Sequence, residues 1–347
     1  MVLGRKKASS KKRVIKAVLK RARKKGNYAA SKGRLLYNGV AAAPRKPFGS
    51  KTGNGKSMAS MKACLNALVP KSLGLPRAVG PYTIIRTTTQ FSWSKKSTVA
   101  IFAPFQDNSP TGPTWLSWAG ITQQGLDTDA IGDPLGILPI LMPTSELGAA
   151  SEIVPASMTI QCMNGKNLQN ADGIFYAARV NQGLNYGGSS VTWGQLKAQI
   201  ISYFSPRLMA GSKLALRGVT SHSYPLNMQE YSDFGPRSNI SSTIWTPFFQ
   251  PCALAPIVFI RGGEQDPDTA TDLSFLITME WRVRFDPLNP AAASHTYHEV
   301  TADSVWNGVI KSASSEGHGI VDTVEDISLT GAMAAAGRFA ISNPELW

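Results

Sequence analysis

The 347-residue chain carries 36 basic and 22 acidic residues, for a net charge of +14, and 43% of its residues are hydrophobic. Its three cysteines are far apart and match neither a disulfide framework nor a zinc-ligand pattern. No run of 18 apolar residues is present to span a membrane, and no apolar signal-peptide stretch follows the basic N-terminus. We therefore expect neither a disulfide scaffold nor stable membrane insertion.

Residues 1–62 form a basic segment. They contain 19 of the 36 basic residues, and the first acidic residue of the chain is Asp107. Because small and polar residues fill the gaps, this arm cannot bury enough apolar surface to offset its ordering entropy, and we predict that it is disordered. A tethered polycation binds phosphates by counterion release, without reading sequence. The predicted nucleic-acid-binding residues are Arg5, Lys6, Lys7, Lys11, Lys12, Arg13, Lys16, Lys20, Arg21, Arg23, Lys24, Lys25, Lys32 and Arg34.

A connector, residues 63–80, precedes a region of alternating hydrophobicity, residues 81–288. The clearest predicted strand is 273–285, whose odd-numbered residues are all apolar, so that they form a core face while the even-numbered face is wet or interfacial. Shorter strands are predicted at 82–93, 97–105, 157–163, 174–180, 213–219 and 256–261, with Pro, Gly, Asn and Asp between them.

The remaining segments interrupt or follow these strands. Thr192 and Gln195 have the spacing of a capping box, which predicts a helix that begins at Trp193 and ends before Pro206. Residues 107–150, rich in Pro and Gly, are predicted to be a long surface loop. Residues 289–347 are predicted to be a C-terminal extension outside the sandwich, with weak helical periodicity near Trp306.

Many strands and few helices favour an all-β fold, an antiparallel sandwich or barrel. The order of basic arm, connector, short strands and long closing strand resembles the single jelly-roll capsid proteins of nodavirus-like and tombusvirus-like viruses, a group that includes coat proteins of related single-stranded DNA viruses. The segments that carry the resemblance are 82–105, 157–180 with the Asn164-Gly165 turn, 221–234 and 273–287. The resemblance implies an eight-stranded antiparallel jelly roll with the arm at its N-terminus.

The same resemblance implies what the chain does. It implies a coat protein that self-assembles into an icosahedral shell of 180 copies (T=3) or 60 copies. The arm would lie inside and package a viral genome of RNA or single-stranded DNA. The expected location is the virion, after assembly in the cytoplasm or nucleus of the host cell.

Few residues suggest chemistry, and we expect no enzymatic activity. Metalloprotease, nucleophile-elbow and P-loop motifs are all missing, and His222 is predicted to be a hydrogen-bonded structural residue. Acidic residues crowd two loops, one at Asp127, Asp129 and Asp133. In the other, Asp266, Asp268 and Asp272 are the choice for calcium at a subunit interface, and a solvated acidic loop is the alternative.

Two other functions, and one other interpretation of the arm, compete with the coat-protein hypothesis. The first is a cellular nucleic-acid-binding β-domain with a basic tail, although the chain after residue 106 is net acidic. The second is a β-sandwich hydrolase with a carboxylate pair drawn from Glu146, Glu152, Glu230 and Asp233. A mitochondrial transit peptide is the third reading of the arm, and the density of lysine argues against it.

Overall fold

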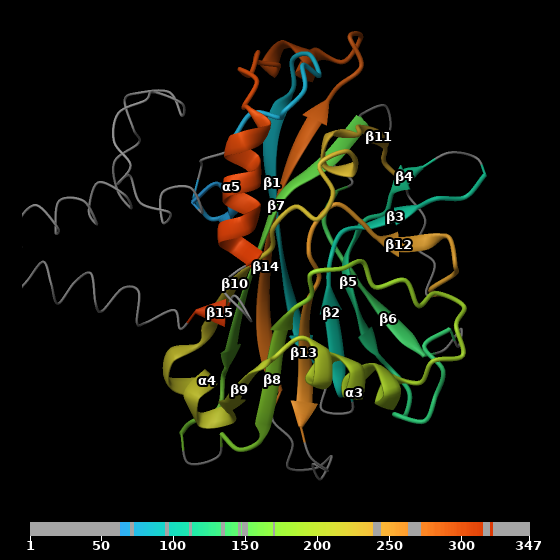
Figure 1. The fold of residues 1–347 in the computed structure, drawn as a ribbon, viewed down its shortest axis with the longest axis vertical. Coiled ribbons are helices and arrows are strands. Elements are labelled where there is room, and N and C mark those ends of the chain that lie inside the picture. The colour runs from blue at the N-terminus through green and yellow to red at the C-terminus, as the bar shows by residue number, and fades with distance from the viewer. Residues whose placement is uncertain are drawn as a thin grey trace, which may run out of the picture. The chain divides into compact units, whose positions relative to one another are not determined.

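The computed structural model describes residues 63–69, 73–93, 97–110, 113–132, 136–144, 147, 152–168, 171–238, 244–262, 272–314 and 320–321 (Figure 1). All of them belong to one compact unit, Met61–Glu325. The predicted arm, residues 1–62, lies outside the described residues, as does most of the C-terminal extension beyond residue 314. Within the described ranges, no helix is long and apolar enough to cross a membrane.

Antiparallel strands form the body of this unit. In chain order they are β1 (Thr83–Trp93), β2 (Val99–Phe102), β3 (Phe105–Asp107), β4 (Thr114–Trp115), β5 (Trp118–Gln123), β6 (Ile137–Leu141), β7 (Glu152–Asn164), β8 (Ile174–Arg179), β9 (Arg207–Ala210), β10 (Val219–His222), β11 (Gly235–Pro236), β12 (Phe249–Pro251), β13 (Ile257–Gly262), β14 (Leu273–Arg284) and β15 (Ile320–Val321). The first sheet has the order β1-β14-β7-β10-β15, with β11 paired to β7, and the second has the order β6-β5-β2-β13-β8-β9. A small third sheet has the order β12-β3-β4.

The two large sheets have the strand order of a jelly roll. Eight of their strands, in chain order, are β1, β2, β7, β8, β9, β10, β13 and β14. The first sheet contains the first, eighth, third and sixth of these, and the second contains the second, seventh, fourth and fifth. This is the double Greek-key arrangement. The predicted all-β antiparallel sandwich is confirmed, but eight is not the full number of strands, because β5, β6 and β15 extend the two sheets.

Strand β14 is an interior strand of the first sheet. It pairs with β1 on one side, Ile277 opposite Thr89, and with β7 on the other, Ile277 opposite Ile160. The odd-numbered residues from Leu273 to Val283 are buried, which confirms the predicted register. Phe285, beyond the strand, is only partly buried. These side chains form a core between the sheets with residues such as Phe102 and Phe259 of the second sheet.

A second hydrophobic core covers the outer face of the second sheet, and it corrects the prediction of a surface loop at 107–150. Strands β3 to β6 occupy much of that segment, and Trp118, Ile121 and Ile137 are buried. They pack with Trp193 and Leu196 of the helix α3 (Trp193–Tyr203). The strands are only two to six residues long and β3 pairs with the distant β12, so local alternation did not reveal them.

The other predicted elements fall into two groups. The capping box at Thr192 and Gln195 is present, and strands lie at or within every predicted position except 213–219. There the structure has α4 (Gly211–Arg217), which ends at Gly218, and residues two apart do not share a helix face, so Leu214 is buried while Leu216 is exposed. The remaining helices are η1 (Ala63–Leu65), η3 (Glu230–Ser232), η4 (Pro290–Ser294) and α5 (Asp303–Ser314).

Candidate functional site

The connector that follows the predicted arm is packed against the outer face of the first sheet. Cys64, Leu65 and Ala67 are buried there. The backbone N–H of Ala67 donates to Thr159 Oγ1 of β7 at 2.9 Å, and this hydroxyl also lies 2.9 Å from His222 Nδ1 of β10. Since Thr159 alternates with inward-facing neighbours, it marks the face turned away from the second sheet. Residue 62, the last of the predicted arm, directly precedes this docked segment.

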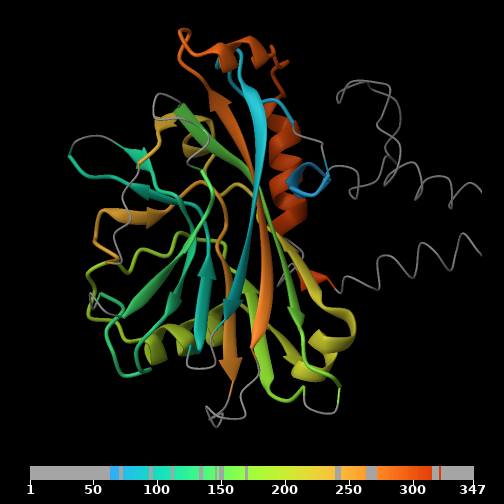
Figure 2. The ribbon, with the colours of Figure 1, turned by 180° about the vertical axis from the view of Figure 1, so that it is seen from behind.

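Helix α5 lies on the same side of the first sheet, away from the second sheet (Figures 1 and 2). The Nε1–H of Trp306 donates to the carbonyl oxygen of Gly74 at 3.0 Å, and the N–H of Thr301 donates to that of Leu75 at 3.1 Å. A Cβ atom at Gly74 would overlap the carbonyl oxygen of Glu299, so only glycine permits this close approach. The segment after the arm and the segment before α5 therefore hold one another on one face.

Part of the outer face of the first sheet is buried. It includes charged residues of β14 that the alternating sequence pattern predicted to lie in water or at an interface. On the even-numbered face of β14, Ser274 and Leu276 are exposed, but Glu280 and Arg282 are 2% and 1% exposed. Burial raises the pKa of Glu280, and hydrogen bonds from the Arg86 guanidinium at 3.1 and 3.2 Å oppose the shift. The prediction of a wet or interfacial face thus fails for this half of the strand, because the covering segments come from distant parts of the sequence.

Two of the buried guanidinium groups, those of Arg282 and Arg179, bond to neighbouring oxygens. Arg282 donates to the hydroxyl of Tyr231 at 2.9 Å and lies 4.3 Å from the centre of its ring. Burial, the main cause, raises the pKa of Tyr231 to about 12, so this phenol stays protonated. Arg179 donates to the carbonyl oxygens of His222, at 3.0 Å, and of Ala313. A cation at Ala313, near the C-terminal end of α5, stabilises the helix through its dipole.

His222 is a structural residue, as predicted. Its ring bonds to Thr159, and burial followed by the nearby Arg179 charge lowers its pKa to about 4. The imidazole is therefore neutral at physiological pH. It joins β10, β7 and, through the Thr159 hydroxyl, the connector.

The residues predicted from sequence to bind ligands fall mostly outside the described ranges. All fourteen predicted nucleic-acid-binding residues, from Arg5 to Arg34, do so, and so do Asp266 and Asp268. Asp272 is described and exposed, next to the start of β14. Among the described residues, no group of three or more His, Cys, Asp or Glu side chains is arranged to hold a metal ion.

Asp127, in the other acidic loop, has a structural role. Burial acts to raise its pKa, but hydrogen bonds from Lys197, Thr98 and Gln123 lower the pKa overall. The Thr98 hydroxyl donates to it at 2.8 Å, and the Gln123 amide does so at 3.1 Å. These bonds tie the loop to α3 and to the start of β2.

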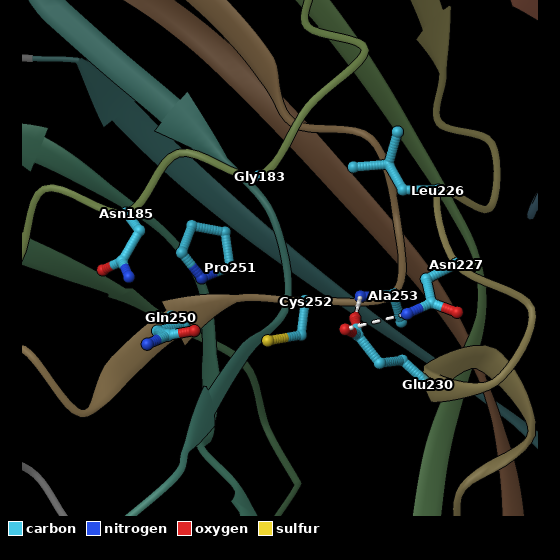
Figure 3. A pocket seen from close by; sticks show the side chains of 9 residues that line it. All are labelled: Gly183, Asn185, Leu226, Asn227, Glu230, Gln250, Pro251, Cys252 and Ala253. Carbon is cyan, nitrogen blue, oxygen red and sulfur yellow. Dashed lines mark hydrogen bonds between the residues drawn. The ribbon is translucent and has the colours of Figure 1, made fainter.

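A cavity of about 220 Å³ lies beside η3 and β12, and Figure 3 shows the side chains that line it. Glu230 is the one carboxylate among its lining residues, and it accepts hydrogen bonds from the Ala253 N–H at 3.0 Å and from Asn227 at 3.2 Å. Glu152, another carboxylate of the hydrolase hypothesis, lies elsewhere, 3.6 Å from Arg284. Burial raises the pKa of Cys252 to about 12, so its thiol is not a nucleophile at neutral pH. The cavity lacks the carboxylate pair that glycoside hydrolysis needs.

Comparison with known proteins finds no matching family model and no matching curated protein. Among solved structures, the chain is similar to the VP2 subviral particle of infectious bursal disease virus, with a TM-score of 0.47 and 8% identity over 79% of this chain and 99% of that chain. It is also similar to the T13 particle of that virus, with a TM-score of 0.45 and 8% identity over 83% and 98% of the two chains. For the decameric BFDV capsid protein the TM-score is 0.28, with 10% identity over 59% and 99%. These values are too low to transfer what those proteins do, and membership of the nodavirus-like or tombusvirus-like group remains a prediction from sequence.

Proposed function

We propose that this chain is the coat protein of a small icosahedral virus. Its copies assemble into a closed shell, and the basic arm packages the genome inside. The observation that carries the proposal is the docking of the connector, through Ala67 and Thr159, on the outer face of the first sheet. The arm is thereby attached to one face of a jelly roll, and α3 and the small sheet cover the opposite side.

The distribution of charge along the chain supports a shell in which the first sheet faces inward. Residues 1–106 contain 24 basic and no acidic residues, whereas the rest of the chain contains 12 basic and 22 acidic residues. A shell with the first sheet turned inward would gather the arms in the lumen, where genome phosphates neutralise them. The genome would be RNA or single-stranded DNA, and assembly would occur in the host cytoplasm or nucleus before release as virions.

The same charges support the larger of the two expected copy numbers. With 19 basic residues per arm, 180 copies neutralise roughly 3,400 phosphates and 60 copies roughly 1,100. Encoding this chain alone takes roughly 1,040 nucleotides, since each residue needs three. A shell of 60 copies would balance little more than the coat gene, which favours 180 copies.

We infer that the chain has no enzymatic activity. The cavity at Glu230 offers a single carboxylate and a protonated thiol, and neither supplies a nucleophile with a general base. Calcium at Asp266, Asp268 and Asp272 is proposed as a clamp between subunits, because carboxylates of neighbouring copies would otherwise repel one another.

Removing the arm tests the proposal. Deletion of residues 1–62 leaves 17 basic and 22 acidic residues, a net charge of −5, and retains every described element. We expect the truncated protein to fold but to lose binding to single-stranded nucleic acid. Full-length protein should lose at least about 10³-fold in affinity between 50 and 200 mM salt, as expected for six or more phosphate contacts.

The control is a full-length variant whose arm has the same composition in scrambled order. It should bind as tightly as the wild type, since counterion release requires charge and not sequence. Electron microscopy of the wild type with nucleic acid should show closed shells of uniform diameter. Tight, salt-insensitive and sequence-selective binding by the truncated protein would instead support the cellular nucleic-acid-binding β-domain.

A further inference from the structure

A short stretch of chain between η4 and α5, residues 295–301, ties three parts of the fold together, and we call it the strap. It lies at the end of the first sheet where β1 begins and β14 ends (Figures 1 and 2). Thr296 exchanges two backbone hydrogen bonds with Tyr82, which directly precedes β1, at 3.1 and 3.2 Å. At the far end of the strap, the N–H of Thr301 bonds to the connector at Leu75. The strap therefore helps to hold the connector on the sheet.

The near end of the strap is fixed to β14 by a histidine. The backbone N–H of Phe285, which directly follows β14, donates to Nε2 of His295 at 2.9 Å. The two rings also stack, with centroids 5.9 Å apart and an angle of 13° between their planes. A ring nitrogen that accepts a hydrogen bond carries no proton, so this contact requires a neutral imidazole with its proton on Nδ1. In an imidazolium both nitrogens are donors, and the bond to Phe285 cannot form.

His298, three residues further along the strap, has the opposite role. Its Nε2 lies 3.2 Å from the carbonyl oxygen of Tyr82 and 3.0 Å from Oγ1 of Thr296. Because a carbonyl oxygen can only accept, Nε2 of His298 is the donor, and a second proton on Nδ1 leaves this bond in place. The ring also stacks on that of Tyr82, with centroids 4.0 Å apart, an arrangement that an added positive charge favours. Protonation of His298 therefore does not weaken the strap.

Other titratable groups do not take the place of His295. Those on the segments that meet here are Arg77, Tyr82, Arg284, Asp286, His298 and Glu299. In the described part of the chain, none of them forms a hydrogen bond or ion pair with the His295 ring: Arg284 bonds to Val79 and lies 3.6 Å from Glu152, and Asp286 accepts from the Leu288 N–H at 2.8 Å. His222 reaches the connector through Thr159, but its pKa of about 4 keeps it neutral in mild acid.

We propose that His295 is a proton-sensitive latch, which fixes the strap to the end of β14 when neutral and releases it when protonated. Because the strap also bonds to Tyr82 and to the connector, its release loosens both. The latch is a property of the folded chain and does not depend on the proposed function. Its consequence for a coat protein does rest on that function: the connector directly follows residues 1–62, so acid would loosen the attachment of the arm.

Hydrogen exchange of the full-length protein tests the latch residue by residue. It is measured at about pH 7.5 and at about pH 5.5, on either side of the value at which a histidine side chain ordinarily titrates, and each rate is divided by the intrinsic rate at that pH. The protection of the Phe285 N–H should fall about tenfold or more in acid, since this partly buried amide loses its acceptor. The amides of Thr296 and Thr301 should lose protection with it, whereas that of Ile277, in the middle of β14, should not.

Two matched substitutions assign the effect. His295→Gln removes the titrating group, so the exchange of Phe285 should no longer respond to pH. His298→Gln, in the same strap, should respond like the wild type. Constant protection in the wild type, an unchanged response in His295→Gln, or a response abolished by His298→Gln would each overturn the latch.

The protonated nitrogen of His295 can also be identified without any substitution. Nitrogen NMR of the wild-type imidazole at about pH 7.5 should show the proton on Nδ1, and a proton on Nε2 would rule the latch out even if His295→Gln does not fold. None of these measurements requires assembly or nucleic acid. A failed latch therefore leaves the coat-protein proposal intact, and a chain that neither assembles nor binds nucleic acid leaves the exchange result standing.

Discussion

Trp306 of α5 offers a direct test of how the connector is held on the sheet. Its side chain is 1% exposed, its ring packs edge-on against Tyr231 with centroids 5.2 Å apart, and its N–H bonds to Gly74. Truncating a buried tryptophan to alanine costs about 3–5 kcal/mol, and the lost hydrogen bond adds about 0.5–1.5 kcal/mol. We therefore expect Trp306→Ala to lower the free energy of unfolding by about 3–6 kcal/mol, a large share of the 5–15 kcal/mol typical of a domain.

Urea denaturation of full-length protein measures this loss, and hydrogen exchange shows where it acts. Exchange should accelerate in the connector, residues 63–75, as well as in α5, because the two segments bond to each other. Tyr297→Ala, on the segment before α5 and 74% exposed, is the control, with an expected change within about 0.5 kcal/mol. A loss below about 1 kcal/mol with unchanged exchange in the connector would refute the idea that α5 holds it in place.

Three further predictions concern the core, pH and calcium. Ile277→Asp should abolish cooperative unfolding, because it buries an unpaired charge at a fully buried position between the sheets. A soluble variant with a normal melting curve would contradict this expectation. His222 has a pKa of about 4 in the fold against 6.5 in the unfolded chain, so the unfolded chain takes up a proton first. The free energy of unfolding should therefore fall by at most about 3 kcal/mol as pH drops from 6.5 to 4, and His222→Gln should remove that part of the pH dependence in melts across the range. If calcium bridges subunits at Asp266, Asp268 and Asp272, chelator should lower the sedimentation coefficient of assembled particles, and Asp272→Asn should do so without chelator; identical sedimentation would support a solvated acidic loop.

The sequence predicts the fold best where one strand carries its own pattern. In β14, six alternating apolar residues define the inner face over the full strand, and the structure has that register. The helix α3 carries its own start signal in Thr192 and Gln195. In contrast, segment 213–219 contains only two alternating leucines, which are too few to define a period, and the structure has a helix there.

Features that depend on distant segments could not be predicted. The even-numbered face of β14 is mostly polar, as a wet surface would be, yet Arg282 is buried against Tyr231 of η3, 51 positions away in the sequence. The bond between Ala67 and Thr159, which holds the connector on the first sheet, joins residues 92 positions apart and has no local signature. The basic composition of residues 1–62 is evident from the sequence, but the docking of the connector on a particular face is a property of the folded chain.

The pairing of β1 with β14 has a consequence for the timing of synthesis. Arg86 and Glu280, opposite one another in these strands, are 194 residues apart, which a ribosome translates in roughly 10–40 s. Throughout that interval β1 has no partner, so the sheet closes only after most of the chain has been made. The basic residues leave the ribosome well before any part of that sheet can form. If the basic segment binds nucleic acid as we propose, it would first meet the nucleic acid around its own ribosome, and the message being translated is the nearest.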